Sequence, residues 1–406
     1  MLEYVTYKLG DVATLINGRA YLMPELQTSG KYRIVRVGNF SGKDEWYYSD
    51  MELSADKYCE NGDLLYKWAC NFGPEIWTQE KAIYHYHIWK IIPDANVIDK
   101  DYLYYLLQFM TSKWLCATNG STMVHITKET MERNAITVPK DVNVQKQIAS
   151  VLKRIDSKIT LNNAICAELE AMAKLLYDYR FVQFDFPDEN GKPYKSSGGK
   201  MVWSEELKRE IPEGWEVKTI GDISRMVTDS ITPNKTSMYH HFSIPAFDDT
   251  HMPVYEPGAS IDSNKYCVND DYILVSKLNP QFKRIWVISK APENSICSTE
   301  YMPFVSTNET KEYLYSTFNS DAFYTFMVNS SSSSTGSRKR MPPEMCPRFK
   351  IPYPKNGSVV AQYCNAVKPM LDRANSMYSE NQELACLRDF LLPLLMNGQV
   401  VINSDE

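Results

Sequence analysis

The chain has 406 residues, more than one hydrophobic core usually organises, so at least two domains are expected. Hydrophobic residues make up 44% of it, including 8 Trp, 27 Tyr and 15 Phe, and this excludes a disordered chain. The formal net charge of -6 argues mildly against a nucleic-acid-binding protein, because such proteins usually carry a basic excess.

Targeting and redox signals point to the cytoplasm. No apolar run approaches the roughly 18 residues of a membrane span, and the first ten residues lack the apolar core of a signal peptide. The nine cysteines are scattered without a C-x-x-C pair, which indicates reduced thiols. We therefore expect a cytoplasmic protein with no membrane partner and no cofactor.

The first part of the chain alternates strand and helix patterns. Residues 32–37 and 84–92 predict strands, and residues 101–115 predict a helix. His85 and His87 would share one face of a strand, but no Cys, Asp or Glu follows at ligand spacing. We interpret them as two ordinary strand histidines, without a metal.

Residues 145–180 contain neither Pro nor Gly and predict one long helix. In one heptad register the a positions are Ile148, Ile155, Asn162, Leu169 and Leu176, and the d positions are Leu152, Ile159, Cys166, Ala173 and Arg180. A helix of this length extends over roughly 50 Å, too far to lie against one small domain, so a helical partner is expected.

The second part of the chain repeats this organisation after a linker. A strand is predicted at 272–276, a helix at 310–328, and a second long helix whose heptad register continues 215 residues after the first. Asn162 and Asn381 would interrupt the two seams, either fixing their register or marking helices that turn this face to solvent. Pro369 predicts that the second helix is bent or begins later than the first.

Short motifs recur in the same order in both parts, which predicts an internal duplication. The motifs around Gly10-Asp11, Cys59 and Pro139 are echoed around Gly221-Asp222, Cys267 and Pro352, at offsets between 208 and 213 residues. The expected fold is α+β: two duplicated mixed α/β domains joined by two long antiparallel coiled-coil-like helices, related by a pseudo-two-fold axis. The two domains would then sit at opposite ends of a rod.

The linker carries the most specific pattern of the chain. The string from Asp188 to Gly199 leads into Met201-Val202-Trp203 and then Glu210-Ile211-Pro212-Glu213-Gly214-Trp215. With the second Gly-Asp motif, and with the terminal segment through Gly398-Gln399-Val400, the chain resembles the specificity subunit of Type I restriction-modification systems over essentially its whole length.

The resemblance implies a domain plan and partners. It implies target-recognition domains at 1–142 and 215–357, a central conserved helix at 143–184, a linker at 185–214 and a distal conserved helix at 358–400. Each domain would read one half of a bipartite site in double-stranded DNA, and the helices would set the spacer and dock two methyltransferase subunits. Restriction subunits would complete the complex, and the specificity subunit itself would catalyse nothing.

We predict the DNA contacts from residue types that can hydrogen-bond to base edges or bind phosphates. The strongest cluster in the second domain is a small-residue loop followed by three cations: Gly336, Ser337, Arg338, Lys339 and Arg340. A further set follows the strand at 272–276: Lys277, Asn279, Gln281, Lys283 and Arg284. The first-domain candidates are Arg19, Arg33, Arg36, Lys67, Asn71, Gly120, Ser121 and Thr122. For each residue taken singly, a surface charge or intradomain ion pair is an equally good interpretation.

Two other functions remain open at this stage. A duplicated scaffold that binds proteins instead of DNA would have the same internal repeat. The net negative charge of the chain suits such a scaffold better than it suits a DNA-binding protein. The sequence Pro187-Asp188 followed by Glu206-Leu207-Lys208 matches the PD…E-x-K pattern of metal-dependent nucleases, but its loop-like composition disfavours the adjacent strands that such a site needs.

Charge is distributed unevenly. Residues 1–142 carry net -3, residues 215–357 net zero, and the remaining residues net -3. Neither domain is basic overall, so we expect the chain alone to hold DNA weakly, and partner subunits to supply most of the phosphate contacts.

Overall fold

The computed structural model describes residues 3–41, 45–69, 72–117, 126–308, 310–332 and 338–400. The chain divides into two compact units. Unit 1 is Met1–Lys158 together with Leu384–Glu406, and unit 2 is Ile159–Glu383. No helix in the described part of the chain is long and apolar enough to cross a membrane.

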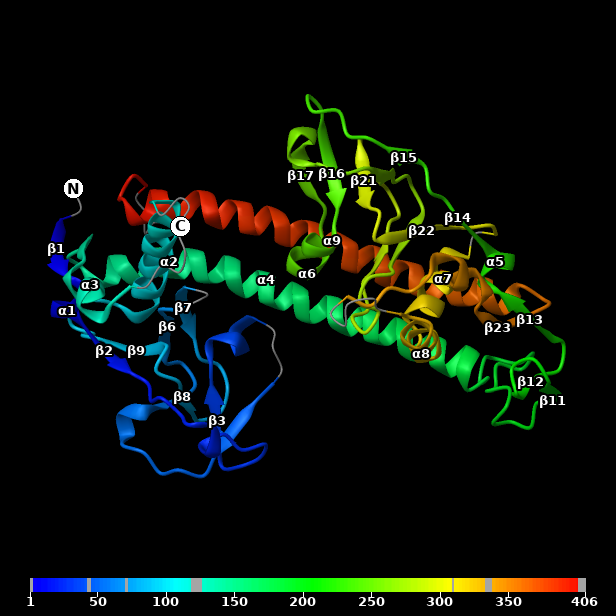
Figure 1. The fold of residues 1–406 in the computed structure, drawn as a ribbon, viewed down its shortest axis with the longest axis horizontal. Coiled ribbons are helices and arrows are strands. Elements are labelled where there is room, and N and C mark those ends of the chain that lie inside the picture. Colours follow the sequence, from blue (N-terminus) through cyan, green and yellow to red (C-terminus); the bar gives the residue numbers. More distant parts are fainter. Residues whose placement is uncertain are drawn as a thin grey trace. The chain divides into compact units, whose positions relative to one another are not determined.

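Unit 1 is a mixed unit of strands and helices (Figure 1). Its elements are β1 (Tyr4–Lys8), α1 (Leu9–Val12), β2 (Ala13–Asn17), β3 (Tyr32–Val35), β4 (Tyr47–Ser49), β5 (Tyr58–Cys59), β6 (Leu64–Lys67), β7 (Gly73–Ile76), β8 (Ala82–Tyr84), β9 (Ile88–Pro93), α2 (Lys100–Ala117), α3 (Lys128–Arg133), β10 (Ala135–Pro139) and the first part of α4 (Val142–Tyr177). Short 3₁₀ turns occupy Met23–Glu25, Val37–Ser41 and Ala55–Lys57.

Two four-stranded sheets form the body of unit 1. Their strand orders are β2-β9-β6-β7 and β4-β3-β8-β5, and β1 pairs with β10 beside them. The pairing of β3 with β8 is parallel, and the other pairs among these strands are antiparallel. In a half-buried sheet the pairing register decides which side chains enter the core, and here it places Leu15, Leu64 and Ile91 inside.

Helix α4 is attached to unit 1 by a buried polar side chain. Gln145 is fully buried and makes three hydrogen bonds: it donates to the carbonyls of Val97 and Pro139 and accepts from the amide of Asp99. Asp99 in turn accepts a hydrogen bond from the amide of Tyr102 at the start of α2, as an N-cap residue does. Because every polar atom of the Gln145 side chain is used, burying it costs little.

Unit 2 contains the remaining elements. They are the π-turn Asp178–Val182, β11 (Met201–Ser204), β12 (Arg209–Pro212), β13 (Trp215–Thr219), α5 (Ile220–Ile223), β14 (Ser224–Met226), β15 (Ser230–Ile231), β16 (Met238–Phe242), α6 (Ile244–Thr250), β17 (Val254–Pro257), β18 (Lys265–Cys267), β19 (Tyr272–Ser276), β20 (Ile285–Val287), β21 (Ser295–Ser298), β22 (Tyr301–Ser306), α7 (Lys311–Asn319), α8 (Asp321–Asn329), β23 (Lys350–Pro354) and most of α9 (Ser358–Met396). Short 3₁₀ turns lie at Gly258–Ser260 and Pro343–Arg348.

The sheets of unit 2 follow the same order as those of unit 1. One sheet is β14-β22-β19-β20, the other is β15-β18-β21-β16-β17, and β13 pairs with β23. The pair β16–β21 is parallel, as β3–β8 is in unit 1. Strand by strand, the two units therefore have the same topology, apart from the added edge strand β15 and the hairpin β11–β12.

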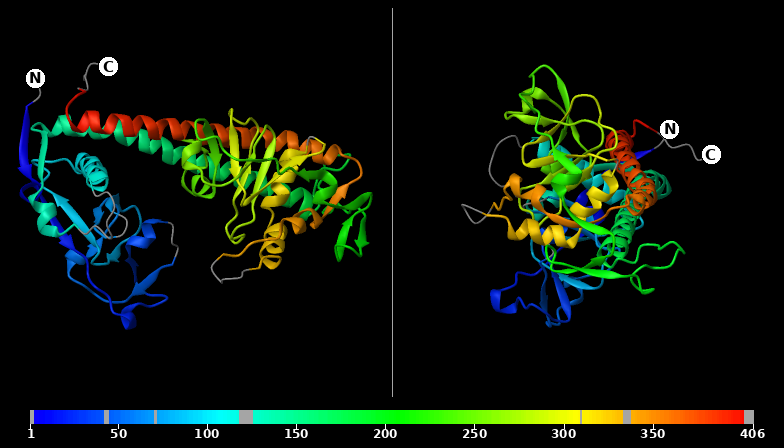
Figure 2. Two further views of the ribbon diagram at one scale, coloured as in Figure 1. Left: turned by 45° about the horizontal axis from the view of Figure 1, so that its top comes forward. Right: turned by 90° about the vertical axis from the view of Figure 1, so that its right-hand side faces the viewer.

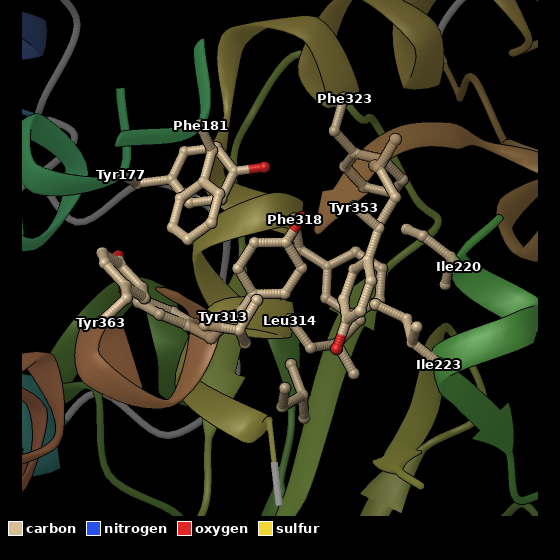
Figure 3. Close-up of a cluster of buried hydrophobic side chains, with 14 of the residues drawn as sticks. Tyr177, Phe181, Ile220, Ile223, Tyr313, Leu314, Phe318, Phe323, Tyr353 and Tyr363 are labelled. Atoms are coloured by element: carbon tan, nitrogen blue, oxygen red, sulfur yellow. The ribbon is translucent and has the colours of Figure 1, made fainter. Parts of the chain in front are cut away.

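Aromatic side chains dominate the core of unit 2, and they come from distant parts of the chain (Figure 3). Phe181 packs edge-on against Tyr313 and Tyr363, with ring centroids 4.8 and 5.2 Å away. The Tyr363 hydroxyl lies 2.7 Å from the Ser316 hydroxyl and 3.0 Å from the carbonyl of Ala173, so its polar end is satisfied. This core therefore joins the end of α4 to α7 and α9.

Within unit 2, α4 and α9 lie side by side (Figure 2). The amide of Asn162 donates to the Asn381 carbonyl oxygen at 2.9 Å, and the Cys166 thiol donates to the carbonyl of Ala374. Cys166 follows Asn162 in α4, whereas its partner Ala374 precedes Asn381 in α9, so the paired segments run antiparallel. Asn162 is fully buried and Asn381 is 9% exposed, so the interpretation that they face solvent is wrong.

Several predicted elements differ in detail. The helix predicted at 310–328 is two helices, because Ser320 is extended and its hydroxyl caps α8 through the amide of Phe323. The strand predicted at 84–92 is split into β8 and β9 by a turn at residues 85–87. The strand predicted at 32–37 ends at Val35 and passes into a 3₁₀ turn.

Helix α9 begins at Ser358, well before Pro369, so the expectation that it begins later than the first helix is wrong. Pro369 removes the hydrogen bond to the carbonyl of Asn365. Both residues are exposed, so water can bind this carbonyl and the helix continues.

Candidate nucleic-acid interface

In unit 2 the sheet β14-β22-β19-β20 ends in a cluster of cations around one carboxylate. Lys277 follows β19, Glu300 lies in the turn before β22, and Arg340 pairs with Leu278 in an isolated bridge. Arg340 and Glu300 form a bidentate ion pair with a shortest distance of 2.7 Å. Arg340 first, and Lys277 and Arg338 after it, hold the pKa of Glu300 below its usual range.

The cluster keeps an excess of positive charge. Arg338 and Lys339 are exposed, and neither makes an ion pair within 4.0 Å with a residue that the structure describes. With Lys277 and Arg340, this end of the sheet therefore carries four cations, three of which lower the pKa of the Glu300 carboxyl. A surface of this charge attracts phosphate groups.

Asn279 positions this segment through its backbone and its side chain. Its φ of +49° is in the left-handed region, which Asn tolerates better than most residues. Its amide donates to the Lys339 carbonyl at 2.7 Å, and its side-chain oxygen accepts from the Lys339 amide at 3.0 Å. Asn279 therefore holds the basic segment against the end of the sheet.

Of the other second-domain candidates, two are held by carboxylates and one is exposed. Arg284 is bound by Asp248 through two hydrogen bonds of 2.6 and 2.8 Å. Lys283 lies between the Asn319 carbonyl and Asp321. Gln281 is exposed. The two cations are thus engaged in intradomain pairs.

In unit 1 the candidate cations are engaged as well. Arg19 forms a bidentate pair with Glu25. Arg33 donates to Gln79 at 3.0 Å and lies over the ring of Trp46. Arg36 donates to the Glu45 carbonyl and stacks 4.2 Å above the ring of Tyr47. Lys67 is 4% exposed and pairs with Glu75 at 2.6 Å.

Aromatic and imidazole rings gather where the sheet of unit 1 ends. Trp68 follows β6, and the turn between β8 and β9 presents His85, Tyr86 and His87. The Trp68 ring packs edge-on against His87 at 5.1 Å, and its indole N–H donates to the Tyr86 carbonyl at 2.8 Å. The strand interpretation is therefore wrong for His87, which lies in the turn, whereas His85 forms an isolated β-bridge with Arg19; the two ring centroids are 4.8 Å apart.

His85 is held in its neutral form. Burial, and then the neighbouring His87 and Arg36, lower the pKa of His85 to about 4. Its ring also stacks near Tyr21. This ring cluster was not among the predicted DNA contacts, although the alternating aromatic and histidine residues 84–87 between two apolar runs are a visible signal.

Six of the predicted site residues lie outside the described part of the chain. They are Asn71, Gly120, Ser121, Thr122, Gly336 and Ser337.

The nuclease-like string is placed in turns. Asp188 accepts hydrogen bonds from the amides of Asn190 and Lys192 in its own turn. Glu206 lies in the β11–β12 turn and pairs with Lys350. Among the residues that the structure describes, no group of three His, Cys, Asp or Glu side chains is placed to hold a metal ion.

Comparison with known proteins relates the first part of the chain to one described family. Residues 1–171 match the family model described as the Type I restriction modification DNA specificity domain. These residues therefore resemble a Type I specificity domain. Over 178 residues the chain is 32% identical to the Type I restriction enzyme MjaIX specificity subunit of Methanocaldococcus jannaschii, a match that covers 43% of this chain and 38% of that relative.

The likeness to specificity subunits extends beyond the matched domain. The Type I restriction enzyme HindI specificity subunit of Haemophilus influenzae is 21% identical, over 98% of this chain and all of the relative. The crystal structure of a Type I restriction-modification S subunit from M. genitalium has the same fold, with a TM-score of 0.59 at 14% identity over 97% of this chain and 96% of the other. The chain is therefore similar to Type I specificity subunits along its whole length.

Proposed function

We propose that this chain selects the DNA sequence for a Type I restriction-modification complex, with each unit reading one half of a bipartite site. The observation that carries the proposal is the specificity-domain match of residues 1–171, joined to the same strand order in unit 2. The proposed target-recognition domains are residues 1–142 and 215–357, and the two domains are copies of one ancestral unit. The chain itself contributes recognition and no catalytic step.

The proposed DNA contacts of unit 2 are those at the sheet end. Arg338 and Lys339 hold phosphates, because their charged groups are exposed and make no ion pair with a described residue. Lys277 lies beside them, and Asn279 holds the segment in place. Arg284 and Lys283 contribute to the fold of the domain through their carboxylate partners.

Footprinting tests this function. The chain assembled with its cognate methyltransferase subunit is expected to protect two separate tracts of DNA, and sequencing of methylated adenines in a host that expresses both proteins gives the two half-sites. Protection of no sequence would contradict the proposal and favour the protein-binding scaffold, which the acidic net charge suits better.

We further propose that the long helices set the spacer and dock two methyltransferase subunits. The support is an exposed apolar row at the end of α4 and in the π-turn that follows: Met172, Leu175, Tyr179 and Val182 are 48, 66, 37 and 41% exposed. Their spacing of three, four and three residues places them on one side of a helix, as in a helix that packs against a partner.

Charged substitutions in this row test the docking. The double variant Met172→Glu, Leu175→Glu is expected to reduce co-purification of the methyltransferase subunit at least tenfold, while the chain keeps its melting temperature because both side chains are exposed. Val254→Glu, at a similarly exposed apolar position on β17, is the matched control and is expected to keep the partner. Equal recovery of the partner with both variants would place the docking surface elsewhere.

A further inference from the structure

The two units have chemically different side chains at one equivalent position of the fold. In unit 2 the amide of Lys277, just after β19, donates to the carbonyl of Glu300 at 2.9 Å. In unit 1 the amide of Trp68, just after β6, donates to the carbonyl of His87 at 3.2 Å. The strands β6 and β19 occupy the same place in their sheets, so Trp68 stands where Lys277 stands, and His87 where Glu300 stands.

The lysine that precedes Trp68 in unit 1 is turned inward. Lys67 is 4% exposed, and its ammonium group is held by Glu75 at 2.6 Å and lies 5.3 Å from the ring of Phe40. Withdrawing it to bind a phosphate would leave Glu75 without this partner. The position equivalent to Lys277 is therefore occupied by a ring in unit 1, and the neighbouring Lys67 is not available to a phosphate.

The rings at this turn contact one another, and Tyr86 remains partly exposed. Tyr86 is 39% exposed at the tip of the turn, with the His87 ring centroid 3.9 Å and the His85 ring centroid 4.5 Å away. Trp68 lies 6.0 Å behind it and is hydrogen-bonded to its carbonyl. A ring whose position is set in this way loses little conformational entropy when it binds.

Two arginines are anchored around the same turn. The backbone of Arg19 is paired with it on both sides: the Arg19 amide donates to Tyr84, and the Tyr86 amide donates to the Arg19 carbonyl. Arg36 lies close enough to His85 to lower its pKa. The turn thus combines an exposed aromatic ring with nearby positive charge, which suits a DNA groove better than a neutral protein surface.

We propose that Tyr86, supported by Trp68 and His87, is the base-contacting residue of unit 1, and that it makes an apolar contact to bases or deoxyriboses of its half-site. The inference rests on the proposed DNA-binding function. It assigns different chemistry to the two half-sites: ring contacts in unit 1 and phosphate-binding cations in unit 2. Affinity for the first half-site then depends little on ionic strength at this position, because an uncharged ring releases no counterions from DNA.

The test uses the full chain assembled with its methyltransferase subunit, on DNA that carries both half-sites. Tyr86→Ala is expected to weaken binding about ten- to a hundredfold, with an unchanged dependence of affinity on salt and with protection lost over one tract. Tyr86→Phe keeps the ring and is expected to bind within about twofold of the wild type. Arg338→Ala with Lys339→Ala provides the contrast, because it is expected to reduce the salt dependence and to affect the other tract.

The outcomes separate this inference from the proposed function. If the wild-type complex protects two tracts and Tyr86→Ala binds as tightly as the wild type, the inference is wrong while DNA recognition stands. If the wild-type complex protects no DNA, the proposed function itself fails. If Tyr86→Ala loses the methyltransferase subunit but the remaining complex binds DNA normally, the turn contacts protein, and the inference is again overturned. Trp68→Phe is a second variant, which keeps an aromatic ring under Tyr86 and is expected to lower affinity less than Tyr86→Ala.

Discussion

At the scale of single residues, most candidate cations serve the fold before they serve DNA. Arg19, Lys67, Lys283 and Arg284 each have a carboxylate partner within the chain. Arg338 and Lys339 differ, because their charges lie at the surface without such a partner among the described residues. Position within three-dimensional structure, and not residue type, separates the two groups.

The salt dependence of DNA binding measures this difference. Arg338→Ala with Lys339→Ala is expected to reduce the slope of log affinity against log salt by about 2, because each phosphate contact contributes about 0.9. The double variant Lys290→Ala, Lys355→Ala removes two other exposed lysines of unit 2 and is the matched control. An equal change of slope in both variants would show that only net charge matters.

His85 gives unit 1 a pH dependence of stability. Its pKa is about 4 in the folded chain, below the usual value of 6.5, chiefly because burial disfavours the imidazolium. A proton therefore binds the unfolded chain more tightly than the folded chain, and stability is lost as pH falls from about 6.5 towards about 4. Thermal unfolding followed from pH 7 to pH 4 is expected to show this loss, and His85→Asn, which cannot take up the proton, is expected to weaken it.

At the scale of elements, the paired helices carry a polar contact inside an apolar seam. Asn162 donates to both Asn381 and Glu380, and Asn381 donates to Asn163 at 2.8 Å. The Asn162 side-chain oxygen is buried with no hydrogen-bond partner in the structure. Such a pair costs stability and favours one register, because a shifted register would separate the two amides.

Substitution of this pair separates stability from register. Asn162→Ala alone is expected to destabilise the chain by about 1–3 kcal/mol, since it leaves the buried side-chain oxygen of Asn381 without its donor. Asn162→Leu with Asn381→Leu is expected to be neutral or stabilising, because the apolar seam then continues. Denaturant unfolding of Asn162→Leu, of Asn381→Leu and of the double variant gives the coupling energy, and additive effects would show that the two side chains do not interact.

At the scale of the whole molecule, the same strand order occurs in both units, while the surfaces at the sheet ends differ. At the end of its sheet, unit 2 has Lys277 and Glu300 at the positions where unit 1 has Trp68 and His87. One scaffold can therefore present different side chains to different half-sites, because strand pairing depends on the backbone and leaves the residues at strand ends free to vary.

The spacer between the half-sites is the property that the helices are proposed to set. Seven residues are inserted into α4 and seven into α9, beside the contact between Asn162 and Asn381. The insertion keeps the heptad register and lengthens both helices by about 10 Å. The methylated site is expected to gain about three base pairs of spacer with both half-site sequences retained, since the axial rise of DNA is about 3.4 Å per base pair. Sequencing of methylated adenines measures this, and a changed half-site sequence would contradict the division of roles between domains and helices.

The long helices and the strand at residues 272–276 were predictable from local pattern alone. Periodic apolar residues identify a helix wherever it packs, and a short apolar run bounded by turn residues identifies a strand. The break at Ser320 and the turn at His85–His87 were missed, because capping and turn formation there depend on hydrogen bonds that pattern does not show. Residue type alone likewise could not separate Arg284, which is held by Asp248, from Arg338.

The sequence by itself thus determines which segments form helices and strands, because these patterns depend on near neighbours in the chain. It also shows that two similar halves follow one another. Tertiary structure alone decides which charges remain at the surface. Lys67 meets Glu75 across the β6–β7 pair, Arg340 meets Glu300 from 40 residues away, and Trp68 meets His87 across β6 and β9. These contacts arise from the pairing of strands and turns, and they determine which side chains at the sheet ends are available to DNA.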